Sequence, residues 1–534
     1  MVYNLRSADG HLTRARNAID ATTTYDIAIV GAGFGGLAMA IRLKRAGIDA
    51  FVLLERGADV GGTWRDNRYP GCACDVPSHL YSFSFELDPD WSRMYATQPE
   101  IQAYLERCAD KYGIRPHVRF GANVVEAAYD DAAALWSLRT ADGNELRARV
   151  VVSAMGGLSR PHVPPLPGSE RFRGARFHSA AWDHGYDLRG KRVAVIGTGA
   201  SAIQFVPQIA PQVAQLDLYQ RTPPWILPKL DFAFDDATKA RFRREPGRMR
   251  RLRNRIYWTN ELRAAGFTID PRLLRVAENV ARKHLAAQVS DAVLRARLTP
   301  DYRLGCKRIL IANDYYPALA RPNVELVTSG IAEVRAASIV TADGRERPLD
   351  ALIYGTGFRA TEPIAPTVIR GAGGLSLDDA WRNGISSYLG ITVAGFPNLF
   401  LLSGPNTGLG HTSVVFMAEA QVNYIMQCLR AMQARRARAV EVLPRAQARF
   451  DRWVQRRMRR TVWASGCKSW YLDARGVNVT LWPSFTVSYW LRTRRMRAAD
   501  YRFIARPAGP ARPPEDEKVR ESPDVNGRRS RLGD

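Results

Sequence analysis

The stretch TYDIAIVGAGFGGLAMAIRLKRAG, residues 24–47, decides the fold class. Its first seven residues are an apolar run typical of a buried strand, and its last residues carry apolar side chains at helical spacing. Between them stands a GxGxxG turn, in which Gly31 makes the tight turn, Gly33 lets a pyrophosphate approach and Gly36 lets helix and strand pack closely. This order predicts a dinucleotide-binding α/β unit, because the start of such a helix binds phosphate.

The next predicted strand, residues 49–55, ends in Glu55. It follows the first glycine by about 20 residues, the distance at which an acidic side chain accepts hydrogen bonds from the ribose hydroxyls of a dinucleotide. Strand, turn, helix and acid together indicate a complete binding unit.

A second unit of the same kind begins with KRVAVIGTGASAIQFVPQIA, residues 191–210. Its turn reads Gly197-x-Gly199-x-x-Ala202, with alanine at a position that tolerates it. The strand after it, residues 215–221, ends in Arg221 and not in an acid. A guanidinium pairs with a 2′-phosphate that a carboxylate would repel, so we expect NADPH in preference to NADH, with Thr222 as a further donor.

Composition narrows the function classes. The 534 residues are too many for one core, so two or three domains are expected. The net charge of +25 would suit nucleic acid, but no nucleic-acid-binding motif accompanies it, so no such partner is expected. The sequence contains no apolar run of about 18 residues, so no membrane span is expected. We expect a cytoplasmic enzyme.

The six cysteines (72, 74, 108, 306, 428 and 467) are scattered along the chain. Without a secretory signal they are expected to be reduced thiols and not a disulfide framework. Cys72 and Cys74 form a CxC with no matching His/Cys pair nearby, so no metal site is expected.

The stretch FRGARFHSAAWD, residues 172–183, has Phe172, Gly174, His178, Trp182 and Asp183 in the pattern FxGxxxHxxxWD. The stretch GGTWRDNRYPGCACD, residues 61–75, fits the pattern [A/G]GxWxxxx[F/Y]P[G/M]xxxD at each specified position. The first resembles the fingerprint of the Baeyer–Villiger monooxygenases, and the second resembles another of their signatures. The resemblance covers roughly residues 24–500. It implies an α/β fold with two Rossmann-like dinucleotide-binding domains, one for FAD and one for NADPH, and a helical insertion.

The resemblance and the composition together divide the chain into seven parts. They are a flexible arm (1–23), the first part of the FAD domain (24–160), the fingerprint linker with the first part of the NADPH domain (161–230), an Arg-, Ala- and Leu-rich helical insertion (231–300), the second part of the NADPH domain (301–387), the second part of the FAD domain (388–506) and a disordered tail (507–534).

The resemblance also implies the cofactor contacts. Those expected for FAD are Gly31, Gly33, Gly36, Glu55, Thr63, Trp64, Arg65, Asp66, Asp75, Tyr81 and Val124. Those expected for NADP are Ala73, Cys74, Asp75, Thr198, Gly199, Ala200, Ser201, Gln204, Arg221, Thr222 and Lys307. Two positions depart from the family pattern, since relatives often carry Arg where Ala73 stands and Ala where Gly355 stands.

The implied reaction inserts one oxygen atom from O₂ next to a ketone carbonyl and gives an ester or lactone. NADPH reduces FAD, O₂ forms a C4a-peroxyflavin, and this species attacks the ketone. Arg308 is the expected catalytic cation, because a guanidinium stays charged where anionic oxygen develops. Asp75 is expected to orient it through a charge-assisted hydrogen bond. His178 and Trp182 are expected to couple domain motion to catalysis and not to touch substrate.

Three alternatives stay open at this point. A flavin monooxygenase that oxidises amines or sulfides shares the glycine loops, and sulfide is a possible second substrate. A disulfide reductase would need a CxxC or CxxxxC pair, which Cys72 and Cys74 do not form. A non-catalytic flavin-binding sensor would not need the Lys307–Arg308 pair. The type of ketone is open, and the protein is expected to be a monomer or a small homo-oligomer.

Overall fold

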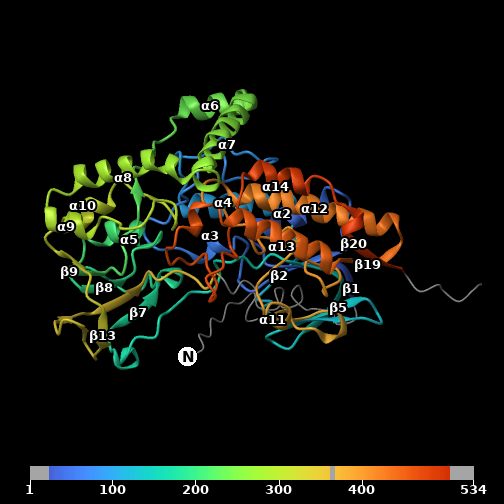
Figure 1. Ribbon diagram of the computed structural model, residues 1–534, viewed down its shortest axis with the longest axis horizontal. Coiled ribbons are helices and arrows are strands. Elements are labelled where there is room, and N and C mark those ends of the chain that lie inside the picture. The colour runs from blue at the N-terminus through green and yellow to red at the C-terminus, as the bar shows by residue number, and fades with distance from the viewer. Residues whose placement is uncertain (1–22, 361–366, 506–534) are drawn as a thin grey trace, which may run out of the picture.

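The computed structural model describes residues 23–360 and 367–505. It holds a mixed sheet and a parallel sheet with helices around them (Figure 1). The predicted arm, apart from Thr23, and the predicted tail lie outside the described residues. None of the helices in the described part of the chain is long and apolar enough to cross a membrane.

The first sheet has eight strands, in the order β17-β4-β5-β6-β1-β2-β3 with β18 paired to β6. Its central strand β1 (Thr24–Val30) coincides with the predicted residues 24–30 and lies parallel to β2 (Phe51–Glu55) and β6 (Glu145–Ser153). The remaining strands are β3 (Val118–Phe120), β4 (Val124–Asp130), β5 (Leu135–Thr140), β17 (Val368–Arg370) and β18 (Leu399–Leu401).

Buried helices cover this sheet. Helix α2 (Phe34–Lys44) follows β1 directly and contacts α12 (Val414–Ala434) from the far end of the chain. Around them are α3 (Thr63–Asp66), α4 (Gln98–Lys111), α11 (Leu377–Ala380), α13 (Pro444–Met458), α14 (Thr486–Thr493) and the hairpin of β19 (Ala437–Val442) with β20 (Tyr501–Ala505). The first dinucleotide unit is therefore built from both ends of the chain.

The second sheet has five parallel strands in the order β12-β9-β8-β16-β7. They are β7 (Ala175–His178), β8 (Arg192–Ile196), β9 (Gln215–Tyr219), β12 (Val324–Val327) and β16 (Ala351–Tyr354), accompanied by α5 (Ala202–Ile209) and α10 (Tyr315–Leu319). A small antiparallel sheet of β13 (Ile331–Val334), β14 (Ser338–Thr341) and β15 (Glu346–Pro348) joins it. The predicted α/β class with two dinucleotide-binding units is confirmed.

The stretch expected as a helical insertion is helical. It holds α6 (Asp236–Arg244), α7 (Pro246–Thr268), α8 (Arg275–Gln288) and α9 (Ala292–Arg297). At its base β10 (Ile226–Leu227) pairs with β11 (Leu310–Ile311), so the chain leaves and re-enters at one place. Figure 1 shows α6 and α7 projecting at the top of the molecule, while α8 and α9 lie over the second sheet.

Two predictions need correction. The chain joins the first sheet again at β17, which pairs with β4, well before the predicted boundary at residue 388. The six cysteines are not all reduced, because Cys306 and Cys467 form a disulfide and the other four are free and buried. Their separation of 161 residues in sequence explains why spacing gave no signal of this bond.

Candidate active site

The first glycine turn is closed by backbone contacts that exclude side chains. Gly31 has φ of +104°, and a Cβ there would lie 2.6 Å from the carbonyl oxygen of Ala154. A Cβ at Gly36 would lie only 1.8 Å from the Gly31 carbonyl oxygen. Gly33 is the N-cap of α2 and no side chain caps that helix. The N–H groups of the first turn can therefore bind a phosphate group.

Glu55 closes this unit at the end of β2. Its buried carboxylate accepts hydrogen bonds from the Ala32 N–H (2.8 Å), the Gly57 N–H (2.8 Å) and Nη1 of Arg65 (2.7 Å). Burial lowers the pKa of Arg65, but the charges of Glu55 and Asp66 outweigh it and raise that pKa overall. The acid predicted to bind ribose is thus fixed in place by the turn itself.

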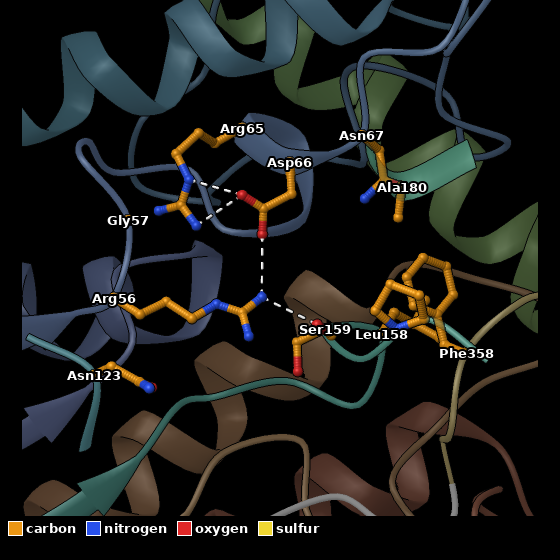
Figure 2. Close-up of a pocket in the computed structure, with 11 residues that line it drawn as sticks. Arg56, Gly57, Arg65, Asp66, Asn67, Asn123, Leu158, Ser159, Ala180 and Phe358 are labelled. Atoms are coloured by element: carbon orange, nitrogen blue, oxygen red, sulfur yellow. Dashed lines mark hydrogen bonds and ion pairs between the residues drawn. The ribbon is translucent and has the colours of Figure 1, made fainter. Parts of the chain in front are cut away.

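A cavity of about 460 Å³ lies beside Glu55. Figure 2 shows Arg56 and Arg65 reaching Asp66 from two sides, with Arg56 also donating to the Ser159 carbonyl at 3.0 Å. The lining comes from both units and the linker between them: Arg56, Gly57, Arg65, Asp66, Asn67, Asn123, Leu158, Ser159, Pro161, Ala180 and Phe358. Because it adjoins the acid at the strand end, this cavity fits the adenosine half of a dinucleotide.

The 61–75 segment carries side chains from this cavity toward the second unit. Trp64 donates from Nε1 to the Tyr81 hydroxyl at 3.2 Å, and their rings meet edge to face at 5.6 Å. Thr63 is exposed at the start of α3, whereas Cys74 is buried and burial raises the pKa of its thiol. Asp75 ends the segment and faces Arg308.

Asp75 and Arg308 form an ion pair across the two units. Oδ2 of Asp75 accepts from Nη2 of Arg308 at 2.5 Å and from Nε at 3.1 Å. The charge of Asp75 raises the pKa of Arg308 above its usual value against the effect of burial. Nη1 of Arg308 donates to the Leu409 carbonyl at 3.1 Å. The side chains remain 28% and 30% exposed, so this cation can meet a small molecule.

The second glycine turn repeats the first. Gly197 has φ of +104°, and a Cβ there would lie 2.5 Å from the Gly355 carbonyl oxygen. A Cβ at Gly199 would meet nothing within 4 Å, so the backbone stays open to a phosphate. Thr198 donates from Oγ1 to the Thr222 carbonyl at 3.3 Å, which joins the turn to the next strand's end. Ala200 is exposed and Ser201 half-buried before α5 begins.

Gln204 on α5 joins the two units. Its Nε2 donates to the Ala73 carbonyl at 3.0 Å, and its Oε1 accepts from the Tyr69 hydroxyl at 2.9 Å. Gln204 therefore ties the helix after the second glycine turn to the segment that carries Ala73, Cys74 and Asp75.

The strand end of the second unit differs from the prediction in register. The Gly31 N–H bonds the Leu54 carbonyl and the Gly197 N–H bonds the Tyr219 carbonyl, so the residue that corresponds to Glu55 is Gln220. Arg221 comes one residue later.

Gln220 is buried and donates from Nε2 to the Arg297 carbonyl at 2.9 Å, while Arg221 is exposed. Burial and the charge of Arg221 both lower the pKa of Lys307. The nearby carboxylate of Asp301 acts in the opposite direction on Lys307. The two cations, Arg221 and Lys307, lie close enough together to fit a phosphate.

Comparison with known proteins agrees with this geometry. Residues 28–244 match the family model described as pyridine nucleotide-disulphide oxidoreductase. A Baeyer–Villiger monooxygenase of Pseudomonas aeruginosa is 51% identical over 90% of this chain and 92% of its own, and one of Streptomyces coelicolor is 50% identical over 90% and 93%. The chain belongs to the Baeyer–Villiger monooxygenases.

Solved structures of similar monooxygenases contain bound NADP. Cyclohexanone monooxygenase from Rhodococcus sp. Phi1, bound to NADP⁺, is 31% identical, with a TM-score of 0.82 over 91% of this chain and all of that one. A steroid monooxygenase bound to NADP is 33% identical, with a TM-score of 0.81 over 90% of this chain and all of that one. The enzyme uses FAD and NADPH, as the two units predicted.

In this monooxygenase the fingerprint is an edge of the second sheet. Strand β7 pairs with β16, and His178 accepts at Nδ1 from the Ala180 N–H at 3.0 Å. Burial lowers the pKa of His178. Trp182 packs against Phe177 and Phe205, with ring centroids 5.1 and 5.2 Å away. These contacts lie within the second unit, and the coupling of domain motion to catalysis by His178 and Trp182 stays a prediction.

The other fingerprint residues make local contacts. A Cβ at Gly174 would lie 2.4 Å from the Phe172 ring and 2.3 Å from the Asp350 carbonyl oxygen, so this bend needs glycine. Asp183 accepts a hydrogen bond from the Gly185 N–H at 2.9 Å and is exposed.

Val124, which was expected at FAD, lies at the start of β4. It is buried beside Asn123, which lines the cavity.

Sequence reasoning missed a buried acid in the monooxygenase. Glu261 on α7 accepts from Thr486 Oγ1 at 2.6 Å and the Val487 N–H at 2.8 Å, and it pairs with His411 Nε2 at 3.4 Å. His411 follows Leu409 by two residues, so the insertion fixes the loop that holds Arg308. No pattern in the helix predicted this, because its partners lie 150 residues or more away.

Proposed function

We propose that the substrate is an apolar ketone and that Arg308 and Asp75 are the catalytic residues. The observation that carries this proposal is the ion pair of Asp75 and Arg308 at the junction of the two cofactor units, with part of the guanidinium exposed. A guanidinium keeps its charge and offers several donors in one plane, as needed where anionic oxygen develops during oxygen insertion.

Each residue has a definite task in this proposal. FAD, once reduced by NADPH, supplies the activation of O₂ and the transfer of oxygen. Arg308 donates hydrogen bonds to the negatively charged oxygen of the substrate adduct. Asp75 holds Arg308 by two hydrogen bonds to one carboxylate oxygen, and the Leu409 carbonyl holds the other end of the fork. The cation is thus oriented before substrate arrives.

The cofactors would be held at the two turns. The free N–H groups of α2, with Glu55 and the cavity beside it, fit the pyrophosphate and adenosine of FAD. The open backbone at Gly199 fits the pyrophosphate of NADPH, and Arg221 with Lys307 fits its 2′-phosphate. The other residues expected at the cofactors keep the roles given above as part of the proposal.

An apolar substrate is favoured by the hydrophobic cluster that packs against Ile309, the residue after Arg308. It joins the insertion to the C-terminal segment through Trp225, Phe267, Leu274, Ala281, Leu304, Met458, Val462, Trp463, Tyr471 and Leu481. Burial raises the pKa of Tyr471 to about 12, so its hydroxyl stays neutral beside the cation. Ketones suit such surroundings, since their one polar atom can take the guanidinium's hydrogen bonds. Sulfides are the second candidate, because they too are apolar around one reacting atom.

A cytoplasmic location and a monomer or small homo-oligomer complete the proposal. Four of the six cysteines are free, which suits a reducing compartment, whereas the Cys306–Cys467 bond does not. Trapping the thiols with an alkylating agent in intact cells would show which state prevails. Light scattering of the purified protein would give its oligomeric state.

The variant Arg308→Ala tests the catalytic assignment. We expect anaerobic reduction of FAD by NADPH to continue, while ester formation from a ketone panel falls about 10²- to 10³-fold, the loss typical of one oxyanion donor. Asp75→Asn should give a smaller loss, because the cation remains but is less well held. The exposed Arg303 supplies the matched control, Arg303→Ala, which should behave as wild type. Undiminished ester formation by Arg308→Ala would refute the assignment.

A further inference from the structure

The Cys306–Cys467 disulfide lies next to the proposed catalytic cation. Cys306 precedes Arg308 by two residues and is 1% exposed, and its Cα is 6.2 Å from that of Cys467. Cys467 is half-buried and belongs to the segment 462–472, which begins with the short 3-10 helix η6 (Val462–Ala464). The bond therefore ties this C-terminal segment to the chain that carries Lys307 and Arg308.

The two ends of the segment are buried at the site. Val462, Trp463 and Tyr471 are at most 3% exposed, and they lie in one buried cluster with Leu304 from the chain that carries Arg308. Beyond Tyr471 the chain is fixed to the loop that holds Arg308, because the Gly408 N–H bonds the Thr480 carbonyl and the Trp482 N–H bonds the Gly408 carbonyl, both at 2.8 Å.

The middle of the segment has no comparable anchor. In the part of the chain that the structure describes, the hydrogen bonds of residues 465–470 are with 462, 471 and 472 and with no distant element. Trp470 is 45% exposed and packs on Tyr471, with ring centroids 4.5 Å apart. The disulfide is therefore the link that fixes 465–470 against the catalytic chain.

The other side of the bond is held independently. Arg308 is fixed by Asp75 and Leu409, the Leu304 N–H bonds Glu278 at 3.0 Å, and the Tyr302 carbonyl accepts from Trp225 at 2.7 Å. Opening the disulfide should therefore free the segment 465–470 and leave Lys307 and Arg308 in place.

We propose that the Cys306–Cys467 disulfide is a positioning element of the reaction, which holds the segment 465–470, including Trp470, and the adjoining Tyr471 at the ketone site. This inference rests on the proposed function, because it concerns the same site. With the bond closed, the segment covers the substrate beside Arg308 and excludes water. With the bond open, the ketone binds more weakly and more of the NADPH is spent without ester formation.

The opening step is a balanced two-electron exchange with a dithiol. One thiolate of the reductant attacks Sγ of Cys467, the S–S bond breaks and Cys306 leaves as a thiolate that takes up a proton. The second thiol of the reductant then displaces Cys467 as a thiol, and the reductant leaves as its cyclic disulfide. The half-buried Cys467 is the sulfur that a reductant can reach first.

The test compares oxidised wild type, wild type reduced with dithiothreitol, and Cys467→Ser. In the two forms without the disulfide, we expect kcat/KM for the ketone to fall by about 10- to 100-fold, the effect of a small displacement at a reacting centre. The ketone KM should rise, and less ester should form per NADPH consumed. The rate of FAD reduction by NADPH should stay within twofold, because Lys307 and Arg308 are held by contacts other than the disulfide. Reoxidation should restore wild type and leave Cys467→Ser unchanged.

Controls separate this role from a general loss of structure. Cys108→Ser replaces a buried free cysteine and should still respond to dithiothreitol. Equal thermal midpoints and flavin contents would show that the reduced protein is folded. Unchanged ketone KM and ester yield after reduction, or peptide mapping that finds both thiols free in the untreated enzyme, would overturn the proposal. If oxidised wild type forms no ester from any ketone, the proposed function itself fails, and this role with it.

Discussion

The two dinucleotide-binding units solve the same packing problem with exchanged residues. In the first unit, Gly36 on the helix faces Ala154 at the end of β6, and a Cβ at Gly36 would lie 3.6 Å from the Ala154 Cβ. In the second, Ala202 on the helix faces Gly355 after β16, and a Cβ at Gly355 would lie 3.3 Å from the Ala202 Cβ. At the point where helix and strand end meet, which we call the crossing, each unit has one alanine and one glycine. This accounts for the glycine at 355, where relatives often carry alanine.

At the end of the strand that follows each helix, the two units differ in charge. Glu55 is buried and bound by the turn and by Arg65, whereas Gln220 takes its place in the second unit and Arg221 and Lys307 lie nearby. The shared glycine turn at the start of a helix suits a pyrophosphate in either unit. The residues at the strand end then decide which dinucleotide fits.

The largest effect should follow from filling the first crossing. Gly36→Ala would place a Cβ 1.8 Å from the Gly31 carbonyl oxygen, a backbone atom that has no room to move. We expect a loss of about 3 kcal/mol or more in the free energy of unfolding, as for a severely overpacked core. Flavin should be lost as well. Thermal unfolding followed by flavin fluorescence measures both.

The matched change in the second unit is Ala202→Gly, which makes its helix like that of the first. It should cost only about 1 kcal/mol, the helix penalty of glycine, and should keep both cofactors. The pair Ala202→Gly with Gly355→Ala recreates the first crossing and should be close to the single change. Equal losses in the two units would show that their crossings do not differ as described.

The second largest effect concerns the choice of nicotinamide cofactor. Gln220→Glu with Arg221→Ala gives the second unit the acid of the first and removes one cation. We expect kcat/KM for NADPH to fall by about 10- to 100-fold, the value of one or two hydrogen bonds to a charged group, while that for NADH changes little or rises. FAD content, set by the first unit, should not change. Retained preference for NADPH would place the 2′-phosphate elsewhere.

Local sequence signals predicted what neighbouring residues determine. Residues 24–30 are a strand as expected, and both turns have the glycines that their backbone contacts require. The hydrogen bond between Asp75 and Arg308, 233 residues apart, is present as the family resemblance implied, although no spacing rule would give it.

Apart from the Asp75–Arg308 pair, features set by pairing between distant segments were not predicted. The correspondence of Glu55 with Gln220 depends on hydrogen-bond register at the turn, which one sequence does not show. The early return through β17 depends on its pairing with β4, and the Cys306–Cys467 bond on the docking of the C-terminal segment. In each case the deciding contact joins segments that are not adjacent in the sequence.

The smallest effect sharpens the difference in charge between the two strand ends. Burial and the charge of Arg221 lower the pKa of Lys307, so this cation loses its proton at a lower pH than an ordinary lysine, whose pKa is about 10.4. Only the protonated form attracts phosphate. As pH rises through the lowered pKa, kcat/KM for NADPH should therefore fall, by about twofold to fivefold for a partly exposed ion pair.

Variants and the second cofactor provide the controls for this prediction. Lys307→Arg keeps its charge and should remove this fall. In wild type, NADH should not show the fall, because it lacks the 2′-phosphate. Arg221→Ala relieves the repulsion and should move the fall to higher pH. A fall that is the same for NADH and NADPH would instead assign the titration to a group outside the phosphate site.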